Sequence, residues 1–366
     1  MLYTIIFVLF LGGTAICKNN KTQSSKTFIA ISFFTLFIVS ACRFQLNSDM
    51  SRNYMHTYEA KFYSWNQLLT FSVESLNWIL RKIVITVFRD PQAYFFVTAA
   101  FIILAYYYNI QKYAKDIYLG IILFFICEGF FPSNNITRQY IAIAICLLNI
   151  KNIIEEKPVK YTIYILFALG FHLSAIVSLP LYFLSKKKFT MNLFKLYLFS
   201  GVILVVFNNQ ATRLMKNIIY SEYDETSYGA SSSNVLRLVW PAFVIICLMI
   251  LYSEQRKCIP HCLEENERQI EIFNNLISHG AILYVYFSLL SAVNSLMFSR
   301  VAVYFTFYSQ LIIGYGIYES KIKQNKKILV ILIWSLCILW FTAMNYAGKF
   351  IPTPYTPFWE YPSRLK

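Results

Sequence analysis

Four arginines of this sequence lie beside the ends of long apolar segments: Arg43, Arg138, Arg237 and Arg300. The guanidinium of arginine is planar and permanently charged, and it can bind two oxygens of a carboxylate or phosphate at once. A single arginine in such a position is more often an anchoring or capping residue than a ligand. Four arginines in such positions favour a binding role, because a cation next to hydrocarbon is costly and usually faces a cavity. We therefore predict a binding site for an anion.

Three further residues near these arginines could take up or donate a proton. Asp49 follows Arg43 closely, and we expect it to act as a general base or to pair with that arginine. Glu74 is expected either to cap a helix or to bring a second carboxylate to the site. His172 lies in an otherwise apolar region, where it is either a buried core histidine or a polar group at the floor of a cavity. Gln139 directly follows Arg138 and would add an amide group to the site.

The sequence lacks the short motifs of several enzyme classes. It has no P-loop, no glycine-rich dinucleotide turn, no HExxH and no GxSxG. The segment from Cys258 to Cys262 offers too few ligands for a closed zinc site, so we expect no metal and no cofactor. The net charge of +15 is expected to serve membrane topology and lipid headgroups rather than nucleic acid.

The composition predicts an all-α, polytopic membrane protein. The chain is 57% hydrophobic and only 14% charged, whereas soluble domains are about a quarter charged. Uncharged stretches such as 91–111 and 328–348 are long enough to cross a bilayer as helices. We expect a single membrane domain, 1–366, with about 12 transmembrane or half-membrane helices. The longest apolar segments predict helices near 3–17, 28–42, 91–110, 117–131, 139–154, 192–208, 238–253, 273–298, 301–318 and 328–347.

The region 161–184 could be one crossing or a hairpin of two short helices. Gly170 and Pro180 interrupt it, which favours a turn near the glycine. The positive-inside rule decides between the two topologies. With a hairpin, 19 of the 33 basic residues lie inside, against 15 with a single crossing. We therefore predict a hairpin at 161–184, with both chain termini outside.

Two long segments then face outward. The segment 43–90 has apolar residues at helical spacing, which indicates amphipathic helices lying along the membrane interface. The segment 209–235 is polar and is expected to form a mobile loop or lid. In this topology 17 of 22 lysines lie inside, whereas nine of 11 arginines lie outside. An outer surface rich in arginine fits an anionic substrate that arrives there.

The order of these residues resembles the EpsG family of Wzy-type membrane polysaccharide polymerases. The matching segments are Arg43…Asp49…Tyr54, Glu74, the N-x-x-R-Q run at 135–139, the F-H-x-S-A run at 171–175, Asn234…Arg237…Pro241, Arg300…Tyr304-Phe305 and Pro354-Tyr355. The resemblance covers nearly the whole chain.

The resemblance implies a polymerase of lipid-linked oligosaccharide repeats on the outer side of the bacterial cytoplasmic membrane. It would transfer a glycan from undecaprenyl pyrophosphate to the non-reducing-end hydroxyl of another lipid-linked repeat, in O-antigen, capsule or exopolysaccharide synthesis. Asp49 would be the base, with His172 or Glu74 as substitutes. The pyrophosphate would be held by Arg138, Arg237 and Arg300, while Arg43 would place the acceptor or pair with Asp49.

Arginines can neutralise pyrophosphate without a divalent ion, so this chemistry requires no metal. The expected partners are the lipid-linked donor and acceptor, membrane lipids, and a chain-length regulator and flippase of the same system. Two other functions remain open from the residues alone: a flippase of lipid-linked oligosaccharides, which should show internal repeats, and a membrane acyltransferase, which would need a catalytic histidine.

Overall fold

The computed structural model describes residues 1–19, 23–44, 49–70, 74–207, 209–210, 213, 238–263, 266–293, 296–321, 323–347 and 355–360. Within these ranges the regular elements are all helical, as the composition predicts. The first half contains α1 (Leu2–Asn19), α2 (Gln23–Ala41), α3 (Asp49–Glu59), α4 (Trp65–Thr70), α5 (Ser75–Phe88), α6 (Gln92–Tyr113), α7 (Ile117–Ile126), α8 (Phe130–Asn135), α9 (Thr137–Leu148) and α10 (Ile150–Ile154). The second half contains α11 (Pro158–Leu169), η1 (Leu173–Ser178), α12 (Leu181–Leu184), α13 (Met191–Val206), α15 (Val239–Ser253), η4 (His261–Leu263), α16 (Glu267–Val293), α17 (Leu296–Ala302), α18 (Thr306–Tyr318), α19 (Lys323–Tyr346) and η5 (Phe358–Glu360).

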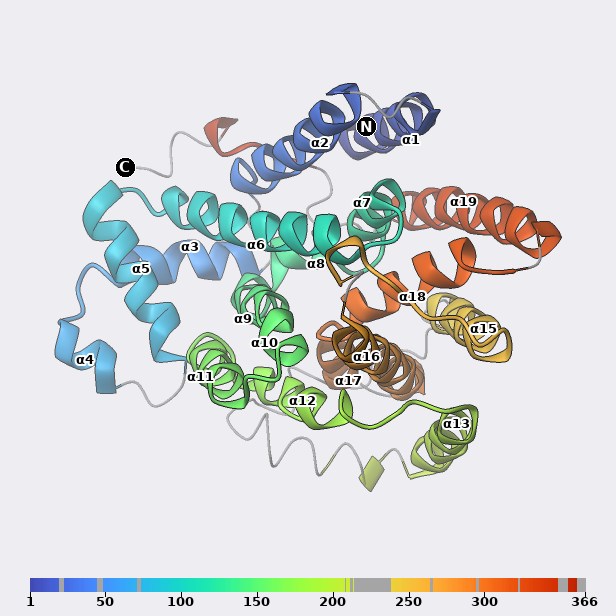
Figure 1. Cartoon of the computed structure of the whole chain (residues 1–366). Helices are drawn as coiled ribbons and strands as arrows, with labels where there is room; N and C mark the ends of the chain where they lie inside the picture. The colour runs from blue at the N-terminus through green and yellow to red at the C-terminus, as the bar shows by residue number, and fades with distance from the viewer. Residues whose placement is uncertain are drawn as a thin grey trace.

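The helices pack around one continuous cluster of buried apolar side chains that extends from Tyr3 to Phe341. In Figure 1, α6 crosses the middle of the molecule, with α1 and α2 on one side of it and α9 to α11 on the other. In the second half, α16 lies against α13, α15, α17 and α18.

Three helices are long and apolar enough to cross a membrane: Gln92–Tyr113, Glu267–Ala292 and Lys326–Tyr346. Seven other apolar helices have 10–17 residues. The exposed residues of α1, α2, α13 and α19 are largely isoleucine, leucine, valine and phenylalanine, which suits contact with hydrocarbon. The chain is thus a helical membrane protein, while the number of crossings, expected to be about 12, stays a prediction.

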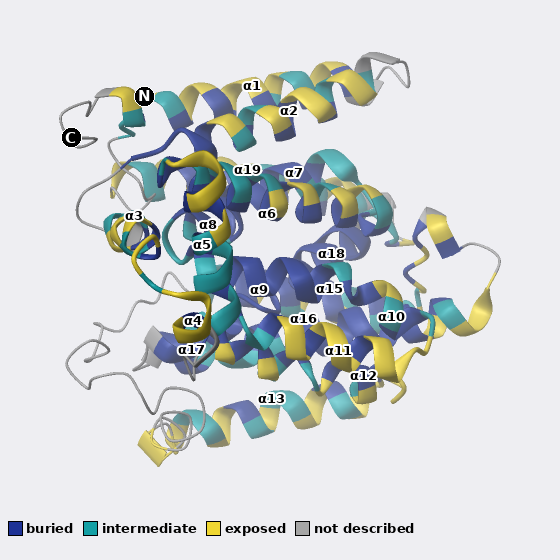
Figure 2. Ribbon diagram, turned by 90° about the vertical axis from the view of Figure 1, so that its left-hand side faces the viewer, coloured by how far each residue is buried: buried dark blue, intermediate teal, exposed yellow. Residues whose placement is uncertain are grey.

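The segment 43–90 forms α3, α4 and α5. Figure 2 shows α3 and α4 at the same end of the molecule as the N-terminus and α17. The polar side of α5 faces the protein, because Asn77 and Arg81 are buried there. Its apolar side is exposed at Ile83, Val87 and Phe88. This arrangement fits the predicted amphipathic character of the segment, with the apolar face turned outward.

The predicted hairpin at 161–184 is confirmed as a reversal of the chain. After α11 the chain turns at Gly170, and η1 and α12 run back along it. Tyr161 at the start of the hairpin donates a hydrogen bond to the carbonyl of Ser178, 2.5 Å away. The ring of Tyr161 also stacks on Tyr182 with centroids 5.5 Å apart. The first and last turns of the hairpin are therefore neighbours.

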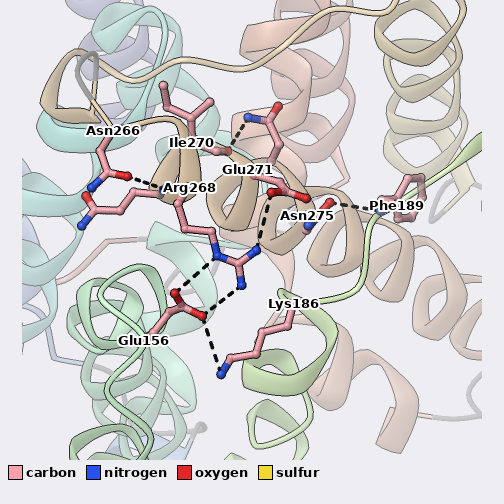
Figure 3. Close-up of polar contacts among 10 residues, drawn as sticks. Glu156, Lys186, Phe189, Asn266, Arg268, Ile270, Glu271 and Asn275 are labelled. Atoms are coloured by element: carbon pink, nitrogen blue, oxygen red, sulfur yellow. Dashed lines mark hydrogen bonds and ion pairs between the residues drawn. The ribbon is translucent and has the colours of Figure 1, made fainter.

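A network of ion pairs holds the other end of α11. Glu156 lies two residues before this helix, and its carboxylate accepts from Arg268 at the start of α16 over 3.1 Å. Lys186, just after α12, lies 3.8 Å from the same carboxylate, and Glu271 lies 3.5 Å from Arg268 (Figure 3). Three segments are thus joined by side chains that face water.

Three of the predicted helices are interrupted, among them the one predicted at 139–154, which is divided between α9 and α10. The helix predicted at 117–131 ends at Ile126, and the short α8 follows a turn at Cys127–Gly129. Glu128 has a left-handed backbone (φ 45°), and a Cβ at Gly129 would lie 2.4 Å from the carbonyl oxygen of Phe124. The chain therefore bends sharply there. Similarly, the helix predicted at 301–318 is divided between α17 and α18.

The C-terminal residues 355–360 return to the end of α2. The amide of Phe44 donates to the carbonyl of Thr356 over 2.8 Å, and the amide of Phe358 donates to Cys42 over 3.0 Å. Tyr355 also lies against Tyr3, with ring centroids 6.1 Å apart. Both ends of the described chain thus lie at the same end of the molecule. The side of the membrane that this end faces stays a prediction, with the outside as our expectation.

Candidate functional site

A carboxylate, a histidine and an arginine meet where the hairpin turns. Nδ1 of His172 lies 2.7 Å from Oε1 of Glu74, and the other carboxylate oxygen of Glu74 accepts a hydrogen bond from Arg138. Glu74 and His172 are almost fully buried, at 6% and 5% exposure. Three predicted site residues from distant segments of the chain are therefore in contact.

The local backbone explains how Glu74 reaches this position. The amides of Leu76 and Asn77 donate to the carbonyl of Gly170, which docks the first turn of α5 on the hairpin. A Cβ at Gly170 would lie 2.4 Å from the Leu76 side chain, so only glycine permits this approach. Glu74 itself has a left-handed backbone (φ 56°), a strained conformation of the kind found at functional sites.

Glu74 does not act as a helix cap, one of the two roles expected from the sequence. It occupies the N-cap position of α5, but its side chain makes no capping hydrogen bond. Burial alone would raise the pKa of Glu74, but the hydrogen bond from His172 and the nearby arginines hold the pKa below its ordinary value. Glu74 is therefore a carboxylate at neutral pH.

A polar pocket adjoins this cluster. The described residues that line it are Arg52, Asn53, Asn135, Ile136, Thr137, Arg138, Gln139, His172 and Arg300. They come from α3, the α8–α9 turn, the hairpin and α17, and they include three arginines and no carboxylate. Because Nδ1 of His172 is directed at Glu74, Nε2 on the other side of the ring is the nitrogen available to this pocket.

Gln139 connects two walls of the pocket. Its amide nitrogen donates to the backbone carbonyl of Arg300, so α9 and α17 are held together beside the lining arginines. The structure thus brings together four of the predicted residues around one pocket, Arg138, Gln139, His172 and Arg300, and places Glu74 directly behind them.

Arg43 lies outside the pocket. It is 1% exposed, and its guanidinium donates to the carbonyl of Asn134 (3.1 Å) and the hydroxyls of Thr137 (3.1 Å) and Ser40 (3.0 Å). The guanidinium carbon of Arg43 also lies 5.0 Å from the centroid of the Phe95 ring. These bonds join the end of α2 to the turn that precedes Arg138. In this position Arg43 supports the site from behind, whereas the sequence predicted that it would place the acceptor or pair with Asp49.

Two predicted site residues cannot be placed fully. Arg237 lies outside the described residues, so its role in holding an anion stays a prediction. Asp49 begins α3, but its side chain is outside the described part of the chain. Its predicted role as base also remains a prediction.

The structure adds Arg81, which the sequence analysis did not single out. Arg81 is 1% exposed, and its Nη2 donates to Oδ1 of Asn53 over 2.6 Å. Its guanidinium carbon lies 5.0 Å from the ring of Trp78 and 5.4 Å from that of Tyr94. The spacing of Glu74, Asn77 and Arg81 along one helix face was the available signal, since it marks a polar stripe on α5.

His56 also lies near this cluster. Its ring lies 5.2 Å from that of Trp78. Burial and the positive charges of Arg81, Arg138 and Arg52 lower the pKa of His56 to about 4. His56 is therefore neutral at physiological pH and adds no further positive charge.

Apolar helices surrounding a cationic pocket at one end define an integral membrane protein with a charged site near its surface. The EpsG family model matches residues 26–363, nearly the whole chain, so the protein belongs to the EpsG family. Membership places it, in general terms, among membrane polysaccharide polymerases with glycosyltransferase-like activity. Comparisons with curated proteins and with solved structures gave no match.

Proposed function

We propose that this protein polymerises lipid-linked oligosaccharide repeats at the outer face of the bacterial cytoplasmic membrane. It transfers a growing glycan from undecaprenyl pyrophosphate to the non-reducing-end hydroxyl of another lipid-linked repeat. The observation that carries the proposal is the Glu74–His172 pair beside an arginine-lined pocket. A glycosyl pyrophosphate donor requires both features: a base for the acceptor and cations for the leaving group.

His172 acts as the general base. The Glu74 carboxylate lies 2.7 Å from Nδ1 and holds the ring in place, so that Nε2 on the other side of the ring receives the proton of the acceptor hydroxyl. A carboxylate that orients a histidine in this way also stabilises the imidazolium formed after proton transfer. Asp49, the base predicted from the sequence, belongs to α3, and two later residues of this helix, Arg52 and Asn53, line the same pocket.

The arginines bind the pyrophosphate. Three guanidinium groups, those of Arg52, Arg138 and Arg300, line the pocket, and its described lining includes no carboxylate. A pocket lined by guanidinium groups favours an anion, because each guanidinium can bind two phosphate oxygens at once. A pyrophosphate supplies that anion, and its charge increases as the glycosyl bond breaks.

The reaction balances without any other reagent. The oxygen of the acceptor hydroxyl forms a bond to the anomeric carbon of the donor glycan, and its proton passes to Nε2 of His172. The bond between this carbon and the pyrophosphate oxygen breaks, and its electron pair leaves with the pyrophosphate. The products are one longer lipid-linked glycan and undecaprenyl pyrophosphate.

Purified protein in proteoliposomes, supplied with lipid-linked repeats and no ion gradient, tests the proposal. We expect chains of several repeats on a gel, and a flippase would leave chain length unchanged. In cells, deletion of the gene should leave single-repeat glycans, whereas complete loss of the glycan would point to a flippase.

The identity of the base is tested with isosteric variants. His172→Gln should abolish chain growth while the protein stays at normal abundance in the membrane. Asp49→Asn should then retain activity. If instead a well-expressed Asp49→Asn variant is inactive and His172→Gln is active, Asp49 is the base and His172 positions the acceptor.

A further inference from the structure

Asn53 occupies an unusual place for an uncharged residue in this site. It lies on α3 with 4% exposure, and it lines the pocket beside the arginines and His172. Its backbone is fixed as well, because its carbonyl accepts a hydrogen bond from the hydroxyl of Thr57 over 2.7 Å. The side chain therefore meets the pocket from a rigid turn of helix.

Arg81 determines which way the Asn53 amide points. The amide atom 2.6 Å from Nη2 of Arg81 must be oxygen, because a guanidinium has only donors. The amide nitrogen, the other terminal atom of the Asn53 side chain, then points away from Arg81. Since Asn53 lines the pocket, the structure directs its N–H donors there.

Arg81 is well suited to hold this amide still. It is buried to 1% exposure between the rings of Trp78 and Tyr94. Its Nε has no hydrogen-bond partner among the described residues. The hydrogen bond from Nη2 to Asn53 is therefore one of the few polar contacts of this guanidinium. A buried cation has few alternative positions, which keeps the amide orientation from changing.

We propose that Asn53 is a substrate-binding residue that donates a hydrogen bond to an anionic oxygen of the leaving pyrophosphate, and that Arg81 is its positioning residue. The inference rests on the proposed polymerase function. A neutral donor fixed in advance strengthens binding of a developing anion, as amide donors do in oxyanion holes. It does so without repelling the neighbouring arginines.

Asn53→Asp separates this role from a structural one. Aspartate keeps the shape and the oxygen that accepts from Arg81, so the thermal unfolding temperature should stay equal or rise. The substitution removes the N–H donors, and the affinity for inorganic pyrophosphate should fall about ten-fold or more. Asn53→Ala removes the donor without adding a negative charge, and it should lose affinity similarly.

Asn77→Asp is the matched control. Asn77 is a second buried amide of this region, bonded to the hydroxyl of Tyr94 over 2.7 Å, and it is not among the pocket-lining residues. Its change to aspartate adds a carboxyl group nearby but removes no donor from the pocket, so pyrophosphate affinity should fall by less than in Asn53→Asp.

The role of Arg81 is tested by a double-mutant cycle. Arg81→Lys should weaken pyrophosphate binding in the wild-type background and have little further effect in the Asn53→Ala background, because it acts through the amide. Equal effects in both backgrounds would show that Arg81 acts independently, which would overturn the positioning role.

The outcomes distinguish the two proposals. Wild-type affinity in Asn53→Asp, or in Asn53→Ala, overturns the role of Asn53. A wild-type protein that polymerises but is not inhibited by pyrophosphate also overturns it, while the polymerase function stands. A wild-type protein that neither lengthens lipid-linked glycans nor binds pyrophosphate overturns the polymerase proposal itself.

Discussion

Near each end of α11 a glutamate pairs with basic side chains, and the two glutamates differ in their exposure to water. Glu156, just before the helix, pairs with Arg268 and Lys186 (Figure 3), and its side chain is 37% exposed. Glu74, which meets His172 just after the helix, has a side chain that is 5% exposed. Both glutamates have left-handed backbones, with φ of 54° and 56°.

Burial is what makes these two clusters different. Around Glu156, water and salt screen the charges, so the pairs join segments but contribute little to stability. Around Glu74, low dielectric strengthens each interaction, and an unpaired group would be costly. The same side-chain types thus produce a surface contact at one end and a fixed, polarised site at the other.

The largest expected difference concerns activity. Glu74→Gln should lower the polymerisation rate by about 10²-fold or more, because His172 loses the charge that orients and stabilises its protonated ring. Glu156→Gln should stay near wild type. Initial rates in proteoliposomes, normalised to inserted protein, provide the measurement. An active Glu74→Gln variant would mean that the buried cluster is structural only.

Substitution of the arginines should show the same contrast in activity between the two clusters, with smaller effects than substitution of the glutamates. Arg138→Lys keeps the charge and loses the planar fork, so we expect about a ten-fold or greater loss of polymer. Arg300→Lys and Arg237→Lys should behave alike if they hold the pyrophosphate. Arg268→Lys at the exposed cluster is the control and should be near normal. Normal glycan length in Arg138→Lys, Arg300→Lys and Arg237→Lys would place the pyrophosphate site elsewhere.

The docking of α5 on the hairpin should appear as a difference in stability. Gly170→Ala places a Cβ 2.4 Å from the Leu76 side chain, so unfolding should become easier by about 1–3 kcal/mol. Gly12→Ala in α1 is the control, since nothing lies within 4 Å of a Cβ there. Thermal unfolding in detergent compares the two. Equal unfolding temperatures would show that α5 can shift without cost.

The membrane orientation of the two ends can be determined without any change in activity. Single cysteines replace the exposed Tyr58 and Lys187 in a protein that lacks its eight native cysteines. A membrane-impermeant maleimide should label position 58 in intact cells and position 187 only after permeabilisation. The reverse pattern would put the Glu74 cluster on the cytoplasmic side.

Much of the fold was predictable because it depends on local properties. Most of the long helices follow uninterrupted apolar segments, and the hairpin follows from Gly170 and the distribution of lysines. The break between α7 and α8 was missed, since Glu128 adopts a left-handed backbone that no residue preference indicates. The role of Glu74 as a capping residue was likewise wrong, because its contacts are with distant segments.

The sequence by itself determined that this chain is a helical membrane protein and which residues, among them His172 and Arg138, could form an anionic site. Apolar length, charge distribution and residue chemistry are properties of short segments, so they can be recognised without coordinates. Only the tertiary structure decided that Glu74 joins His172 and Arg138, that Arg81 belongs behind the pocket, and that Arg43 does not line it. These outcomes depend on contacts between residues distant in the sequence, such as Glu74 with Arg138 and with His172, and on which side of each helix faces the protein.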